Sequence, residues 1–190
     1  MPAPSASSGR CLWFLTRFPS WWIGFAEGLP LGGGVRMLDS VDQIELSRRQ
    51  RPREGRSGEV AAALRALAFA ASEEDAEVAY HRVLFAVGNN HGGSYFPIVL
   101  DAIPFLGEVL GGGTRFGRAR ALDVLIDLIS SFEPDPEILV QEGLRPDELP
   151  GMLHASVDRL RPILQVLATD SAVPELQRLA RELIDSLDED

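Results

Sequence analysis

Apolar residues recur at helical spacing through residues 57–190, and this periodicity constrains the fold more than any other feature of the chain. The first example places Val60, Leu64, Leu67 and Ala71 on one face, with the i, i+4, i+7 spacing of an amphipathic helix. Similar segments follow, separated by short breaks that contain Gly, Pro or a capping residue. The alternating β-branched pattern typical of strands does not occur. We therefore expect an all-α fold without a sheet.

Caps and breaks set the expected bounds of the helices. Ser57 and Ser72 are suited to cap the first two, because a Ser hydroxyl accepts a hydrogen bond from a free amide of the first turn. Gly88 is suited to end the second helix. A third helix is expected from near Tyr95 to the glycines at 111–113, with Pro97 in its first turn, and a fourth from about Arg115 to Ser131. A loop or short helix follows near residues 135–146. A fifth helix carries Leu153 to Leu167 and is interrupted by Pro162, and the last helix is capped by Asp170 or Ser171.

Amphipathic helices joined by short turns favour helical hairpins packed side by side. We expect an α-α superhelix of about three stacked helical hairpins within residues 57–190. Residues 37–56 form a lead-in segment and an Arg-rich linker. Residues 1–36 begin with a Pro-, Ser- and Ala-rich stretch that favours disorder. They are either a disordered extension or a mis-called gene start, with Met37 as the natural first residue.

The N-terminal apolar stretch is not expected to cross a membrane. It is short, and Arg17 and Pro19 interrupt it. A single Arg10 before it and the sequence LPLGGG after it match a signal peptide poorly. Cys11 is the one cysteine, which excludes an internal disulfide framework and a thiolate zinc site. This cysteine content suits a reducing cytoplasm.

Charge is distributed unevenly along the chain. Residues 1–56 contain eight Arg and five acids, a net charge of +3. Residues 57–190 contain ten Arg and 23 acids, a net charge of −13, so the whole chain carries −10. Such an excess repels nucleic acid and favours a basic protein partner. Five Arg lie within residues 48–56, but Pro52, Gly55 and the lack of interleaved aromatic residues favour a solvated linker over a nucleic-acid patch.

One break stands out from the others: VGNNHGGSYFPIVLDAIPFL, residues 87–106. The candidate partner-binding residues in it are Asn89, Asn90, His91, Tyr95 and Phe96. Most residues of this corner also suit a structural role, because Asn and Gly tolerate turn geometry. Ser94 can cap the next helix, and the aromatic pair after it can pack across the corner. Only His91 has no clear structural duty.

No motif of a catalytic or metal site is present. His81, His91 and His154 show neither HExxH nor His-x-His spacing. Ser94 lies three residues from His91, which does not build a triad, and the chain has no Lys to meet a phosphate. We expect no catalytic residue, no metal and no cofactor. A small-ligand or enzymatic site at the 88–96 corner is the alternative.

The segment AIPFLGEVL, following GNNHGGSYFPIVLD, resembles the HEAT-repeat-like bacterial proteins, in which a Gly-Asn or His-Gln-Gly corner, a Tyr and an Ala-Val-Pro-Phe-Leu helix follow one another. The resemblance covers residues 37–131 and, loosely, the C-terminal helix pair. Its specific part is the block from Gly88 to Leu110, and the chain departs from the pattern where NNH is followed by Gly-Gly. The resemblance implies an α-solenoid used for protein binding, and some such proteins resemble immunity partners in bacterial toxin loci.

These observations together predict a non-enzymatic protein-protein interaction module with an acidic surface. A sharper version is an immunity protein that blocks a basic toxin by charge-complementary docking. The second alternative is nucleic-acid binding through an Arg-lined groove, as in some HEAT-like glycosylases. The charge of −13 in residues 57–190 disfavours it.

Overall fold

Helices form most of the part of the chain that the structure, a computed structural model, describes: residues 38–42 and 58–189. The helices are α2 (Glu59–Ala68), α3 (Glu73–Val87), α4 (Val99–Gly112), α5 (Arg115–Ser130), α6 (Pro136–Glu142), α7 (Glu148–Asp158), α8 (Arg161–Thr169) and α9 (Pro174–Asp188). The predictions for residues 1–37, for the Arg-rich linker and for the Ser57 cap lie outside the described residues. For the described ranges, the predicted all-α class is confirmed in its main content.

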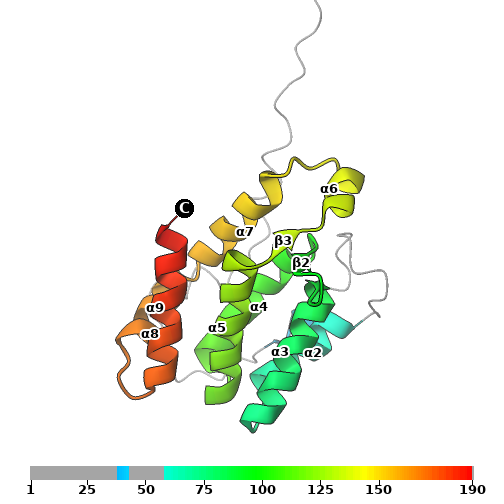
Figure 1. The fold of residues 1–190 in the computed structure, drawn as a ribbon. Coiled ribbons are helices and arrows are strands. Elements are labelled where there is room, and N and C mark those ends of the chain that lie inside the picture. The colour runs from blue at the N-terminus through cyan, green and yellow to red at the C-terminus, as the bar shows by residue number, and fades with distance from the viewer. Residues whose placement is uncertain (1–37, 43–57, 190) are drawn as a thin grey trace, which may run out of the picture. The chain divides into compact units, whose positions relative to one another are not determined.

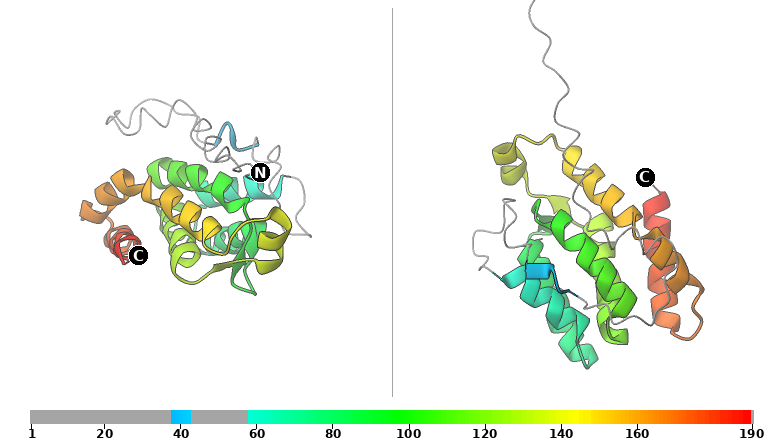
Figure 2. Two further views of the ribbon diagram at one scale, coloured as in Figure 1. Left: turned by 90° about the horizontal axis from the view of Figure 1, so that it is seen from above. Right: turned by 180° about the vertical axis from the view of Figure 1, so that it is seen from behind.

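The helices lie in two rows (Figures 1 and 2). Helices α3, α5 and α9 are side by side in one row, and α2, α4 and α8 form the other. Each helix of the first row packs on the helix that precedes it in the chain, as α2–α3, α4–α5 and α8–α9, while α7 packs on α4 and α5. The apolar faces meet between the rows, where Leu64, Leu106 and Leu125 are fully buried.

Local sequence explains where several helices begin. The Ser72 hydroxyl accepts a hydrogen bond from Asp75 N at 3.1 Å, so the predicted cap of α3 is confirmed. Thr114 caps α5 in the same way, accepting from Gly117 N at 3.1 Å. Of the two alternatives expected near residues 135–146, a loop or a short helix, the structure has the short helix, α6.

The expectation of a fold without a sheet is wrong. Three two-residue strands, β1 (Gly88–Asn89), β2 (Ser94–Tyr95) and β3 (Glu133–Pro134), form a small sheet in the order β1-β2-β3. β1 and β2 are antiparallel, whereas β2 and β3 are parallel. Strands this short leave no periodic pattern in the sequence. Because Ser94 and Tyr95 are engaged in strand pairing, Ser94 does not cap a helix, and α4 begins at Val99 rather than near Tyr95.

The starts of the last two helices differ from the sequence-based expectation. Pro162 was expected to interrupt one long fifth helix, but the structure has two helices, and Pro162 lies in the first turn of α8. Pro174 likewise occupies the first turn of α9, after Val173, so neither Asp170 nor Ser171 caps that helix. Proline suits a first turn because the amide it lacks has no partner within the helix there.

Residues 38–42, part of the expected lead-in segment, pack on the helices. Leu38 and Val41 are buried, with 1% and 0% of their surface exposed. Leu38 N donates a hydrogen bond to the Glu108 carboxylate in α4 at 2.7 Å. Asp42 accepts two hydrogen bonds from the Arg65 guanidinium in α2, at 2.9 and 2.7 Å. Both apolar and polar contacts therefore hold this segment.

A close approach of α2 and α5 gives the first prediction. A Cβ added at Gly117 would lie 2.1 Å from the Leu67 carbonyl oxygen, whereas one added at Gly151 in α7 would have nothing within 4 Å. Gly117→Ala is expected to lower the free energy of unfolding by about 1–3 kcal/mol, because backbone must move to make room. The control Gly151→Ala is expected to raise it by up to about 1 kcal/mol through helix propensity. Urea unfolding measures both, and equal effects would contradict the close contact.

A second prediction concerns the anchor of residues 38–42. Burial raises the pKa of Glu108 above its ordinary value, and the hydrogen bond from Leu38 N opposes this rise only in part. A carboxyl with a raised folded-state pKa favours folding at low pH, and this contribution is lost as the pH rises through that pKa. Glu108→Gln removes the titration and keeps an acceptor for Leu38 N. Its stability relative to the natural chain is therefore expected to increase from pH about 4 to pH about 7.

Denaturant unfolding at a series of pH values measures this difference. The variant Glu74→Gln, at an exposed position of α3, corrects for the loss of one negative charge. Each variant is compared with the natural chain at every pH. If the Glu108→Gln and Glu74→Gln variants show the same stability difference throughout, the burial of the Glu108 carboxyl is contradicted.

Candidate partner-binding corner

Residues 88–96 connect α3 to α4 and form a closed turn. The Asn89 side chain accepts a hydrogen bond from Gly92 N at 3.1 Å, and its backbone oxygen accepts from the same amide at 3.0 Å. Gly93 adopts a left-handed backbone conformation, with φ of 61°, which a residue without a Cβ adopts at little cost. The Asn89 side chain is therefore committed to its own loop.

The next residue ties the corner to α3. Asn90 Nδ2 lies 2.9 Å from His81 Nδ1, within hydrogen-bonding distance. The other ring nitrogen of His81 lies 3.2 Å from a carboxylate oxygen of Glu77, one turn earlier in the helix. These two contacts hold the His81 ring of α3 against the loop. They also give Asn90 a structural partner that sequence reasoning missed.

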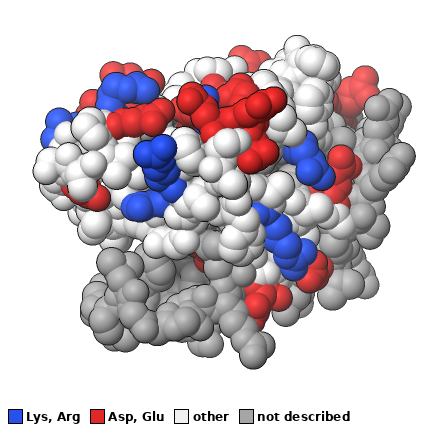
Figure 3. Space-filling view, turned by 90° about the horizontal axis from the view of Figure 1, so that it is seen from below, with Lys and Arg blue, Asp and Glu red and all other residues white. Residues whose placement is uncertain are grey.

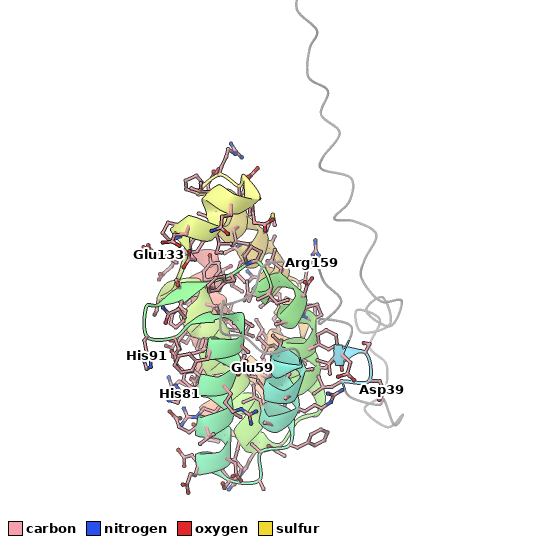
Figure 4. All side chains as sticks on the ribbon, turned by 90° about the vertical axis from the view of Figure 1, so that its right-hand side faces the viewer. Asp39, Glu59, His81, His91, Glu133 and Arg159 are labelled. Carbon is pink, nitrogen blue, oxygen red and sulfur yellow. The ribbon has the colours of Figure 1, made fainter. Side chains whose placement is uncertain are left out.

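His91 is exposed but does not lie free of contacts. Its ring meets that of Phe85 edge-on, with 4.9 Å between centroids, an arrangement favoured between aromatic rings. Phe85 is itself 39% exposed on α3. The contact joins residues six apart across a helix end, a spacing that no helical or strand pattern would indicate. His91 thus has a packing role and remains accessible on the surface (Figure 4).

The two aromatic residues of the corner are in the core. Tyr95 and Phe96 are 2% and 8% exposed, and Phe96 N donates to the Val87 oxygen at 2.9 Å. Burial, together with the nearby charge of Glu133, raises the pKa of Tyr95 to about 12. The structure therefore brings three of the five candidate residues toward the surface and places this pair in the interior. In this state the pair supports the corner and does not offer side chains to a partner.

The corner is joined to a second connection, between α5 and α6. Ser94 pairs with Glu133, and Tyr95 with Pro134, in the parallel pairing of β2 and β3. Glu133 N donates to the Gly93 oxygen at 2.9 Å, just beyond this pairing. Sequence reasoning missed this link, because two-residue strands about forty positions apart give no local signal. As a result, the corner and the start of α6 belong to one surface.

Helices α3 and α5 share a polar network below the corner. The Arg120 guanidinium lies 2.9 Å from Glu77 and 2.7 Å from Asp123. The Tyr80 hydroxyl donates a hydrogen bond to Asp127. The Arg120–Glu77 and Tyr80–Asp127 contacts connect neighbouring helices of one row, whereas the Arg120–Asp123 pair lies within α5. These contacts have a structural role, because each of these groups is engaged by a neighbour in the fold.

Comparison with known proteins leaves the function to be argued from this geometry. No family model, no curated protein and no solved structure matches the chain. Within residues 38–42 and 58–189, no group of three or more His, Cys, Asp or Glu is placed to hold a metal ion. None of the helices in that part of the chain has the length and apolar character needed to cross a membrane.

The two tyrosines of the chain, Tyr80 and Tyr95, give a prediction for the pH dependence of the site. Burial raises both pKa values; for Tyr80, the hydrogen bond to Asp127 and nearby carboxylates raise the pKa further. The native protein is therefore expected to show no tyrosinate absorbance near pH 10, where the urea-unfolded chain titrates. Stability is expected to fall as the pH rises above about 10, because the folded state disfavours the phenolate.

Spectrophotometric titration of the native chain measures tyrosinate formation, and urea unfolding at a series of pH values measures the loss of stability. Asp127→Asn, which removes the charged acceptor, is expected to bring the pKa of Tyr80 down towards its ordinary value, while Tyr95 keeps its raised pKa. A native tyrosine that titrates near pH 10 before unfolding begins would show that its surroundings differ from those described.

Proposed function

We propose that this chain is a non-enzymatic protein-binding module that presents an acidic surface to a basic protein. One observation carries the proposal: none of the described Asp, Glu or Arg residues is fully buried, although the Glu108 carboxyl is partly covered. Most of the acidic side chains in residues 58–189 are therefore open to solvent. A surface with an excess of acids attracts a basic partner and accelerates its association.

The proposed architecture is a HEAT-like α-solenoid. Two rows of helices, in which consecutive helices pair as hairpins, support this architecture. The sequence block from Gly88 to Leu110, with its HEAT-like pattern, supports it as well. Solenoids bind proteins along extended rows of helices and the loops between them. The lone Cys11 is consistent with a cytoplasmic location for such a module.

The sharper form of the proposal is immunity against a basic toxin, such as a nuclease. An acidic protein that covers the active surface of a basic enzyme would inhibit it by charge-complementary docking. The alternative of a ligand site at the 88–96 corner gains no support, because Asn89 is bonded within its own loop and Tyr95 is buried. Nucleic-acid binding is disfavoured by the net negative charge.

The proposal is tested by isolating the tagged full-length chain with its partner from the organism that encodes it. The expected result is a stoichiometric complex with a basic protein. With both proteins purified, the Kd is expected to weaken at least tenfold as salt rises from about 50 mM to about 300 mM, because screening weakens contacts between exposed charges. Calorimetry at each salt concentration measures the Kd.

Two further observations complete this test. A partner that is toxic when produced alone and harmless with this chain would support immunity. A short DNA duplex serves as the control polyanion and is expected not to bind at any salt concentration. An acidic partner, or a Kd independent of salt, would overturn the proposed charge complementarity.

A further inference from the structure

A short helical projection stands at the edge of the helix rows. It consists of residues 133–148, here called the α6 prong: β3, α6 and the turn that leads into α7. Figures 1 and 2 show α6 set apart from the two rows of helices. Ile138 and Leu139 turn inward, with 5% and 7% of their surface exposed, whereas Val140 is 81% exposed. Val140 is the most exposed of the large apolar residues in the described part of the chain.

The α6 prong is strongly acidic around this apolar side chain. Its sequence EPDPEILVQEGLRPDE contains six acids and one Arg. The guanidinium of that Arg145 faces Asp147 and Glu148, at 3.6 and 3.5 Å. Helical spacing puts Glu137, three residues before Val140, on the same outward side of α6. The opposite end of the helix rows is mixed in charge, because Arg residues (blue) and acidic residues (red) lie side by side there (Figure 3).

Hydrogen bonds close both ends of α6 even though the prong is exposed. Asp135 caps α6 by accepting hydrogen bonds from Glu137 N at 3.0 Å and Ile138 N at 3.2 Å. At the other end, Gly143 is left-handed with φ of 64°, and Leu144 N donates to the Leu139 oxygen at 2.9 Å. An exposed apolar residue on a capped helix loses little conformational entropy when a partner covers it.

The α6 prong continues the surface of the corner. The pairing of β2 and β3 fixes Glu133 beside Gly93. Figure 4 shows Glu133, His91 and His81 one below another on the same side of the molecule. A partner bound to the prong would therefore also contact His91, an exposed residue of the corner.

From these observations we infer that the α6 prong is the docking surface for the basic partner, with Val140 as its apolar anchor. The occupant is a segment of a protein that carries one apolar side chain between Arg or Lys residues. Its cations meet the carboxylates around α6, and the aliphatic stems of Arg and Lys cover the exposed apolar surface. This inference rests on the proposed function, and it adds the place of binding and the chemistry of the partner segment.

Site-specific photo-crosslinking in the encoding organism tests the location. A benzophenone amino acid replaces Val140 or His91 in the full-length chain; the controls replace Val166 in α8 and Val78 in α3, which are 64% and 55% exposed. The expected result is that one basic protein, identified by mass spectrometry, crosslinks at positions 140 and 91 and not at 166 or 78. Crosslinks of the partner only at 166 or 78 would overturn the docking surface and leave the proposed function standing. No crosslink at any position and no complex would overturn both.

Binding measurements with the purified partner then test the chemistry. Val140→Asp is expected to weaken the Kd at least tenfold, and the control Val166→Asp less than twofold, since both positions are exposed and both variants should fold. The double change Glu137→Gln with Glu142→Gln is expected to weaken binding and to reduce its salt dependence. Its matched control is Glu74→Gln with Glu175→Gln, on α3 and α9. Circular dichroism confirms folding, and equal effects of prong and control variants would overturn the inference.

Discussion

Two hydrogen bonds from Thr114 to the end of α2 and the turn after it fix the start of α5, the helix on which the rest of the structure depends. Thr114 N donates to the Ala68 oxygen at 3.1 Å, and its hydroxyl donates to the Ala70 oxygen at 2.7 Å. The bond to Ala68 satisfies one of the carbonyl groups that a helix end otherwise leaves without a partner, and the bond to Ala70 holds the turn that follows α2. They also place α5 against α2 so closely that Gly117 has no room for a side chain. Helix α5 in turn contacts α2, α3, α4, α7 and α9.

The apolar spacing in the sequence predicted this helical framework well, because each helix buries one stripe and the stripe is visible in the chain. The cap at Ser72 could be predicted for the same reason, since capping is local. The failures concern interactions between residues distant in sequence. The pairing of Ser94 with Glu133 has no local pattern, and Pro162, expected to interrupt a helix, lies in the first turn of one.

The candidate site was predicted in part. Asn89, Asn90 and His91 do form an accessible or half-exposed turn. Tyr95 and Phe96 are also candidate partner-binding residues, but both lie in the core, in agreement with the expectation that the aromatic pair can pack across the corner. The α6 prong could not be predicted as part of this surface. Its acids are visible in the sequence, whereas its position beside the corner depends on β3.

In this fold, the residues that stabilise the core are separate from the exposed residues that a partner could contact. The rows of helices supply stability through buried apolar faces, and none of the described Asp, Glu or Arg residues is fully buried between them. Surface residues can then change with little effect on the core. This separation is consistent with a module whose affinity for a partner is adjusted by exposed carboxylates and a few apolar contacts.

The pairing of β2 with β3 has a consequence for how such a protein can diversify. Loops between helices usually tolerate insertions and deletions. Here the α3–α4 and α5–α6 loops share backbone hydrogen bonds, so a change of length in one displaces the other. Related chains that keep this pairing should therefore conserve both loop lengths together. New partner preferences would then arise by exchange of side chains along the corner and α6, with the backbone of both loops held constant.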